Sequence, residues 1–139
     1  MVTCVVADGT ASAPNLIDAF DLKTDSSRVP EQLKDLAWAL SSKLSGMTVD
    51  VAVIKLADVG PTGTRKAAPR NRLLIEGALA LTCEQKVADQ VFLRTGKEIG
   101  ASLGGSKAES QAAGKALHDK RVDAATAALF GLLPNLTVS

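Results

Sequence analysis

The chain has 139 residues and a net charge of +1, with 16 lysines and arginines against 15 aspartates and glutamates. This length fits one domain and is short for two, and the balanced charge excludes a polycation, so affinity for nucleic acid has to come from a local patch. Hydrophobic residues make up 46% and aromatic residues only 3%, which argues against disorder and against a stacking platform for single strands.

The first 45 residues predict a β-hairpin followed by a helix. Residues 2–7 are β-branched and apolar, and Asp8 and Gly9 then form a strong turn dipeptide. Residues 16–24 alternate in part between apolar and polar side chains, as a second strand does. A helix is expected over residues 28–45, where leucines and alanines recur at i, i+3, i+4 and i+7 spacing.

The remainder of the chain alternates between strand and helix. The expected elements are a strand at 48–56, a helix at 70–86, a strand at 90–95 and a helix at 106–133. The valine-rich run 48–56 is typical of a strand that is buried on both faces of a parallel sheet. The last helix is expected to be interrupted either around Gly114 or around His118 and Asp119. A hairpin followed by β–α units predicts an α/β domain, with a mixed sheet flanked by helices.

Targeting signals are not evident. The sequence has no run of about 18 apolar residues, and its first residues lack the basic region and apolar stretch of a signal peptide. Cys4 and Cys83 lie far apart in apolar runs, which is typical of free thiols. We therefore expect one soluble, cytoplasmic domain over residues 1–139, with no membrane partner.

Three short patterns, in this order along the chain, resemble the RuvC-type Holliday junction resolvases of the ribonuclease H-like superfamily. They are residues 30–34 at the start of the first helix, residues 49–54 in the valine-rich strand, and the segment from Gly105 and Ser106 to Ser110 and Gln111. The resemblance covers roughly residues 3–133. It implies a single RuvC-like domain with the ribonuclease H-like fold, which is a mixed β-sheet flanked by α-helices.

The resemblance also implies a site of four carboxylates, which hold Mg²⁺ or Mn²⁺ ions that activate water and stabilise the leaving oxygen of a phosphodiester. Asp123 matches the third carboxylate of the family. Thr126 stands where the fourth is expected, and Lys55 stands where a glutamate is expected. The ammonium group of Lys55 would repel a metal ion at that position, so the sequence predicts a degenerate site.

The first carboxylate has two interpretations. Asp8 can be the family's first acid, at the end of the first strand. Alternatively, residues 2–24 correspond to the family's second and third strands, Asp8 belongs to their turn, and the first strand with its acid is missing. Two further acids could act as replacement metal ligands: Asp58, three residues after Lys55, and Asp119, which would share a helix face with Asp123.

A basic segment is the candidate contact to DNA. Residues 59–75 contain no acid and four cations, which are Arg65, Lys66, Arg70 and Arg72. In the resolvases this segment faces the DNA, so the resemblance implies phosphate contacts without base reading. Lys107 lies in the glycine-rich loop and is a further candidate, while Glu109 stands where the family has a basic residue. The alternative interpretation is a solvated basic loop.

Three hypotheses about function follow. The first is a RuvC-like homologue that binds branched or duplex DNA as a homodimer, with weak or lost nuclease activity. The second is a non-enzymatic structural or assembly protein that retains the ribonuclease H-like fold. The third is an active junction endonuclease in DNA recombination, which would depend on Mg²⁺ or Mn²⁺ and use non-standard carboxylates.

Overall fold

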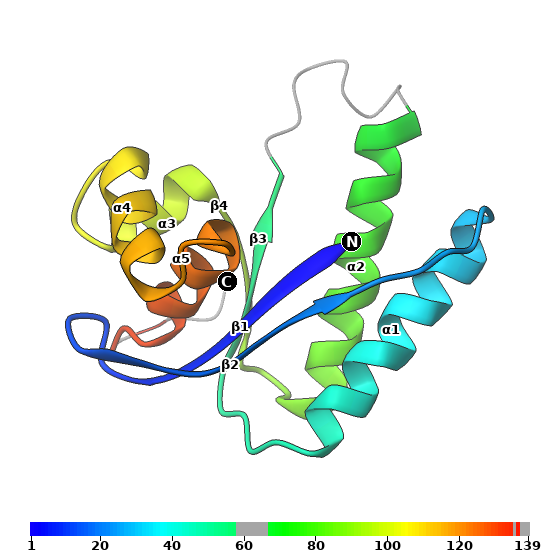
Figure 1. Cartoon of the computed structure of the whole chain (residues 1–139), viewed down its shortest axis with the longest axis horizontal. Helices are drawn as coiled ribbons and strands as arrows, with labels where there is room; N and C mark the ends of the chain where they lie inside the picture. Colours follow the sequence, from blue (N-terminus) through cyan, green and yellow to red (C-terminus); the bar gives the residue numbers. More distant parts are fainter. Residues whose placement is uncertain (58–66, 135, 137–139) are drawn as a thin grey trace.

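The computed structural model describes residues 1–57, 67–134 and 136. Its elements are β1 (Val2–Gly9), β2 (Pro14–Leu22), α1 (Val29–Ser45), β3 (Ala52–Leu56), α2 (Ala67–Lys86), β4 (Val91–Thr95), α3 (Gly96–Ser102), α4 (Lys107–Leu117) and α5 (Val122–Gly131). The strands lie between two groups of helices, with α1 and α2 on one side and α3, α4 and α5 on the other (Figure 1). The α/β class predicted from the sequence is therefore confirmed.

The hairpin is formed by β1 and β2, which pair antiparallel from Val2 opposite Leu22 to Gly9 opposite Pro14. The register shifts once, between Val6 and Ala7. Gly9 has a φ of +91°, and a Cβ at this position would lie 2.6 Å from the carbonyl oxygen of Ala13. The turn therefore requires glycine, because any other residue would be strained by its backbone and would meet the carbonyl oxygen of Ala13 across the turn.

The second pair of strands is parallel. In β3 and β4, Ala52 lies opposite Val91 and Leu56 lies opposite Thr95. The sequence predicts one mixed sheet, but in the part of the chain that is described the strands form two separate two-stranded sheets. Helices cover β3 on both faces, as expected for this run, but every side chain of the strand is only half-buried.

Two hydrophobic clusters lie on the two faces of the strands. On the side of α1 and α2, the buried leucines of these helices pack with Cys83, with hairpin residues such as Phe20, and with Ile54 of β3. On the other side, Phe92 of β4 packs with Ile99, Ala127 and Phe130, and with Val53 of β3. The rings of Phe92 and Phe130 meet edge to face with centroids 6.1 Å apart, a favourable aromatic geometry.

The last third of the chain differs most from expectation. The helix predicted over 106–133 is divided into α4 and α5 by a break from His118 to Arg121, which is one of the two predicted positions. Gly114 lies inside α4 and does not interrupt it. A Cβ at Gly114 would lie 2.9 Å from the carbonyl oxygen of Val122 and 3.1 Å from the backbone nitrogen of Thr126, so this glycine permits the close packing of α4 against α5.

Helix α3 was not predicted. It begins directly after β4 with a complete capping box: the side-chain oxygen of Thr95 accepts from the backbone N–H of Glu98, and the Glu98 carboxylate accepts from the N–H of Thr95. The backbone N–H of Thr95, and secondarily its side chain, lower the pKa of the Glu98 carboxyl below its ordinary value, because hydrogen bonds to the carboxylate favour its ionised form.

Candidate functional site

The candidate site lies at the carboxyl ends of the two parallel strands, the edge at which open α/β sheets generally bind their ligands. Lys55 is the next-to-last residue of β3, and Gly96 follows β4 directly. Asp123 is in the first turn of α5, which packs against β3. The fold thus brings together two of the positions that the resemblance singled out, from segments 68 residues apart.

Lys55 and Asp123 form an ion pair. The Nζ atom of Lys55 donates to Oδ1 of Asp123 at 2.6 Å, with the lysine side chain 15% exposed and the aspartate side chain 62% exposed. The exposed carboxylate makes this pair weakly stabilising for the fold, as surface ion pairs are. The pair matters for metal binding, because the ammonium group of Lys55 already donates a hydrogen bond to one oxygen of the Asp123 carboxylate.

Gly96 provides the room for the Lys55 side chain. A Cβ at Gly96 would lie 3.0 Å from Cε of Lys55 and 3.0 Å from Cε of Lys107. The two lysine side chains therefore converge over this glycine, one from β3 and the other from the start of α4. Lys55, which pairs with Asp123, and Lys107 thus both lie against this glycine.

Thr126 does not face this site. Its side chain is buried and donates to the carbonyl oxygen of Val122 at 2.5 Å. It also lies close to the position that a Cβ of Gly114 would take, with its Cγ2 3.3 Å away. A carboxylate at position 126 of this structure would enter the packed contact between α4 and α5, where a charge would be desolvated without a partner.

Arg121 ties the start of α5 to the hairpin. Its Nε donates to Oδ1 of Asp21 on β2 at 3.0 Å, and its Nη1 lies 3.2 Å from Nε2 of His118. The backbone N–H of Lys120 points at the other ring nitrogen of His118, at 3.3 Å. A neutral imidazole accepts at only one nitrogen, so His118 can satisfy one of these donors, and the Asp21 contact is the one that fixes Arg121.

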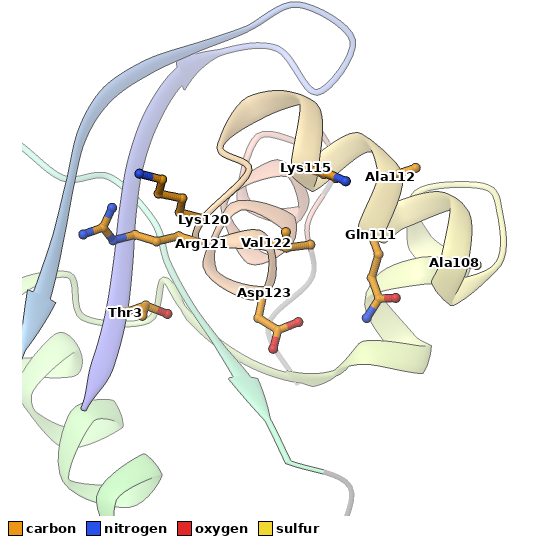
Figure 2. A pocket seen from close by; sticks show the side chains of 9 residues that line it. All are labelled: Thr3, Ala108, Gln111, Ala112, Lys115, Lys120, Arg121, Val122 and Asp123. Carbon is orange, nitrogen blue, oxygen red and sulfur yellow. The ribbon is translucent and has the colours of Figure 1, made fainter.

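A groove of about 630 Å³ runs beside Asp123, between α4, the start of α5 and β1. Figure 2 shows the side chains of Gln111 and Asp123 extending to the same side from α4 and α5, while Lys120 and Arg121 extend towards the hairpin. The lining residues are Thr3, Ala108, Gln111, Ala112, Lys115, Lys120, Arg121, Val122 and Asp123. Three cations against one acid make this groove basic.

Two of the predicted acids do not join Asp123. Asp8 is exposed next to the hairpin turn, five residues of strand, or about 16 Å, from Thr3 in the groove. Asp119 lies in the break before α5, which starts at Val122. The prediction that Asp119 and Asp123 share a helix face is therefore wrong, because four residues span one face only in a continuous helix. Asp58 lies outside the described residues.

The predicted phosphate contacts are only partly described. Arg70 is exposed in the first turn of α2, and Arg72 pairs through Nε with Glu76 at 3.4 Å. Lys107 is exposed at the start of α4. Arg65 and Lys66 lie outside the described part of the chain.

Lys115 and Lys120, which line the groove, were not identified from the sequence as candidate binding residues. A signal was present, because Lys107, Gln111 and Lys115 recur every four residues and therefore lie along one face of α4.

The residues at this site do not fit a pair of metal ions. An ammonium group holds one oxygen of Asp123, and position 126 is packed between helices. Across residues 1–57, 67–134 and 136, no group of three or more histidine, cysteine or acidic side chains could hold a metal ion. Two-metal hydrolysis needs carboxylates around both ions, and the described geometry supplies one carboxylate whose partner is a lysine.

Comparisons with known proteins leave the family undecided. No protein-family model matches the chain, and no curated protein matches it. Among the residues described, no helix has the length and hydropathy needed to cross a lipid bilayer.

Proposed function

We propose that the chain is a RuvC-like DNA-binding domain that contacts the phosphates of branched or duplex DNA and has weak or no nuclease activity. The observation that carries this proposal is the 2.6 Å ion pair between Lys55 and Asp123. A divalent cation that binds Asp123 would lie next to a covalently tethered cation of the same sign, which repels it. The lysine cannot diffuse away, so its effective concentration at the carboxylate is high.

The same residues suit phosphate binding without a metal. Ammonium and guanidinium groups make charge-assisted hydrogen bonds to phosphate oxygens. Lys55 and Lys107 converge over Gly96, and Lys115 and Lys120 line the adjoining groove. Helix α2, which carries Arg70 in its first turn, begins on the side of the molecule towards which β3 points (Figure 1).

Sequence reading is not part of this proposal. The cations come with few aromatic side chains, and phosphate contacts carry no sequence information of their own. We also propose that the chain prefers branched over duplex DNA and forms a homodimer that presents two such grooves. Both points follow from the resolvase resemblance.

Fluorescence anisotropy with a labelled four-way junction and a duplex, measured over a range of salt concentrations, tests the binding. Removing two phosphate contacts should reduce the slope of log K against log salt by about 1.8, because each contact contributes about 0.9. The test variant is Lys115→Ala with Lys120→Ala. Arg121 is left unchanged because its contact with Asp21 holds α5 to the hairpin.

A matched control removes two exposed lysines from other surfaces. Lys34 in α1 and Lys86 at the end of α2 are exposed and lie outside the groove. The double change Lys34→Ala with Lys86→Ala alters net charge equally, so it should leave the slope close to that of the wild type. If both double variants give the same slope of log K against log salt, the proposal that the groove contacts DNA is wrong.

A further inference from the structure

The four strands share one layer, but they do not share one hydrogen-bond network. In the hairpin, Cys4 and Phe20 face α1 and α2, while Asp21 on the opposite face bonds Arg121 at the start of α5. In β3, Ile54 faces α1 and α2, while Val53 packs in the cluster with Phe130 of α5. Both pairs of strands therefore lie between the same two groups of helices (Figure 1).

Within the described part of the chain, each two-stranded sheet has two free edges, and the free edges of β1 and β3 belong to strands that both pack against α5. Among the residues described, β1 pairs with β2 alone and β3 pairs with β4 alone. Helix α5 packs against both β1 and β3, so the two strands adjoin the same helix without pairing to each other. Backbone N–H and C=O groups beneath helices are costly when unpaired, and native folds rarely leave them so.

The composition of the hairpin shows which of its strands is built for an edge. Strand β2 carries Pro14, Asp18 and Asp21, and proline and charge are the usual protection of a true edge strand. Residues 2–7 of β1 contain no charge and no proline, and all six are half-buried. Strand β1 thus has the character of an interior strand, although it has a partner on only one side.

We infer that this layer accepts one additional strand between β1 and β3, supplied as an extended, uncharged segment of a partner polypeptide. The occupant is a single strand because helices cover both faces of the layer. A second copy of β1 would bring β2 and its helices with it, and these could not enter between the two helix groups. Backbone hydrogen bonds along two edges would hold the segment, as in β-strand addition.

The partner's side chains follow from the surroundings. Towards α1 and α2 the neighbours are Cys4, Phe20 and Ile54, so the segment needs apolar residues on that face. Towards α5 the neighbours include Val53 and, near the carboxyl end of β3, the Lys55–Asp123 pair. The alternate face of the segment is therefore apolar or small, with an uncharged polar residue tolerated beside Lys55.

A fused donor strand provides the test. The full chain is extended before Met1 by a flexible linker and an eight-residue strand of valine and threonine, and a control fusion replaces alternate residues of that strand with lysine. Residue-resolved amide hydrogen exchange and thermal unfolding are measured for both fusions and for the unextended chain. The apolar donor should slow exchange at least about tenfold at alternate amides of both β1 and β3 and should raise Tm, and the lysine control should do neither.

Three results would overturn the inference. In the unextended chain, the amides of β1 and β3 that point away from β2 and β4 should exchange readily, so strong protection at low protein concentration would show that the edges are already paired. Protection of β1 that grows with protein concentration would identify a second copy as the occupant. If the fused donor strand slows amide exchange in β1 but not in β3, the hairpin has an open edge but there is no place for a strand between the two sheets. This inference is independent of DNA binding, which the donor experiment does not measure.

Discussion

Replacing Gly114 with alanine should destabilise the protein, although alanine is the better helix former. In the interior of a helix, alanine is favoured over glycine by about 1 kcal/mol. At Gly114, however, the new Cβ would lie 2.9 Å from the carbonyl oxygen of Val122 and 3.1 Å from the backbone nitrogen of Thr126. Both contacts are with backbone atoms, so α5 would have to move away from α4, at a cost of about 1–3 kcal/mol for overpacking.

Gly77 in α2 is the matched control. Outside the backbone of its own helix, no heavy atom lies within 4 Å of the position of a Cβ there, so Gly77→Ala should raise the free energy of unfolding by about 0.5–1 kcal/mol. The two variants should therefore differ by about 2 kcal/mol in urea unfolding followed by circular dichroism, with unchanged m values. If Gly114→Ala proves as stable as Gly77→Ala, the close packing of α4 against α5 is wrong.

Three further predictions concern the capping box, the thiols and the ion pair. Thr95→Ala should lower the free energy of unfolding by about 1 kcal/mol through loss of the N-cap of α3. The backbone N–H of Thr95, which alanine keeps, is the main cause of the lowered Glu98 pKa, so the stability that ionised Glu98 contributes should remain in the variant above the ordinary carboxyl pKa and fade as pH falls through the lowered one, as measured by unfolding at several pH values. Burial raises the pKa of the Cys4 thiol to about 12 and that of Cys83 to about 11, so both thiols should resist alkylation in the native state at pH 8, and rapid alkylation would contradict this prediction. The free energy of unfolding should also fall as pH rises from about 9 towards these values, because the unfolded chain then releases protons that the folded chain retains. Lys55→Glu should create measurable Mn²⁺ binding in calorimetry by placing two carboxylates together, whereas Lys55→Met should not, and equal binding by both variants would argue against the lysine as the obstacle to the metal.

The elements with strong local signals could be predicted from the sequence. The hairpin and the helices at 28–45 and 70–86 were found close to their observed bounds, because alternation and leucine spacing report directly which side chains are buried. Helix α3 was missed although its signal is local: a threonine followed three residues later by a glutamate marks a capping box. The neighbouring glycines favoured a loop instead.

The candidate site could be predicted only where positions in sequence fix positions in space. The resemblance placed Lys55 and Asp123 at corresponding strand and helix positions, and the structure brings them into contact. The pairing of Asp119 with Asp123 failed because it assumed one continuous helix. The groove depends on the close packing of α4 against α5, which Gly114 permits through its contact with Val122 and Thr126, and a contact between two helices has no local signal in the sequence.

A junction-binding and cleavage assay tests the central claim most directly. The wild-type chain and an Asp123→Asn variant are mixed with a labelled four-way junction in the presence of Mg²⁺ and, separately, Mn²⁺, and bound and cleaved DNA are measured from the same samples. With Lys55 holding the carboxylate of Asp123, we predict salt-sensitive binding by both proteins and little or no cleavage by either, since each 1.36 kcal/mol of lost transition-state stabilisation slows the reaction about tenfold. Robust metal-dependent cleavage by the wild type that disappears in Asp123→Asn would contradict the account.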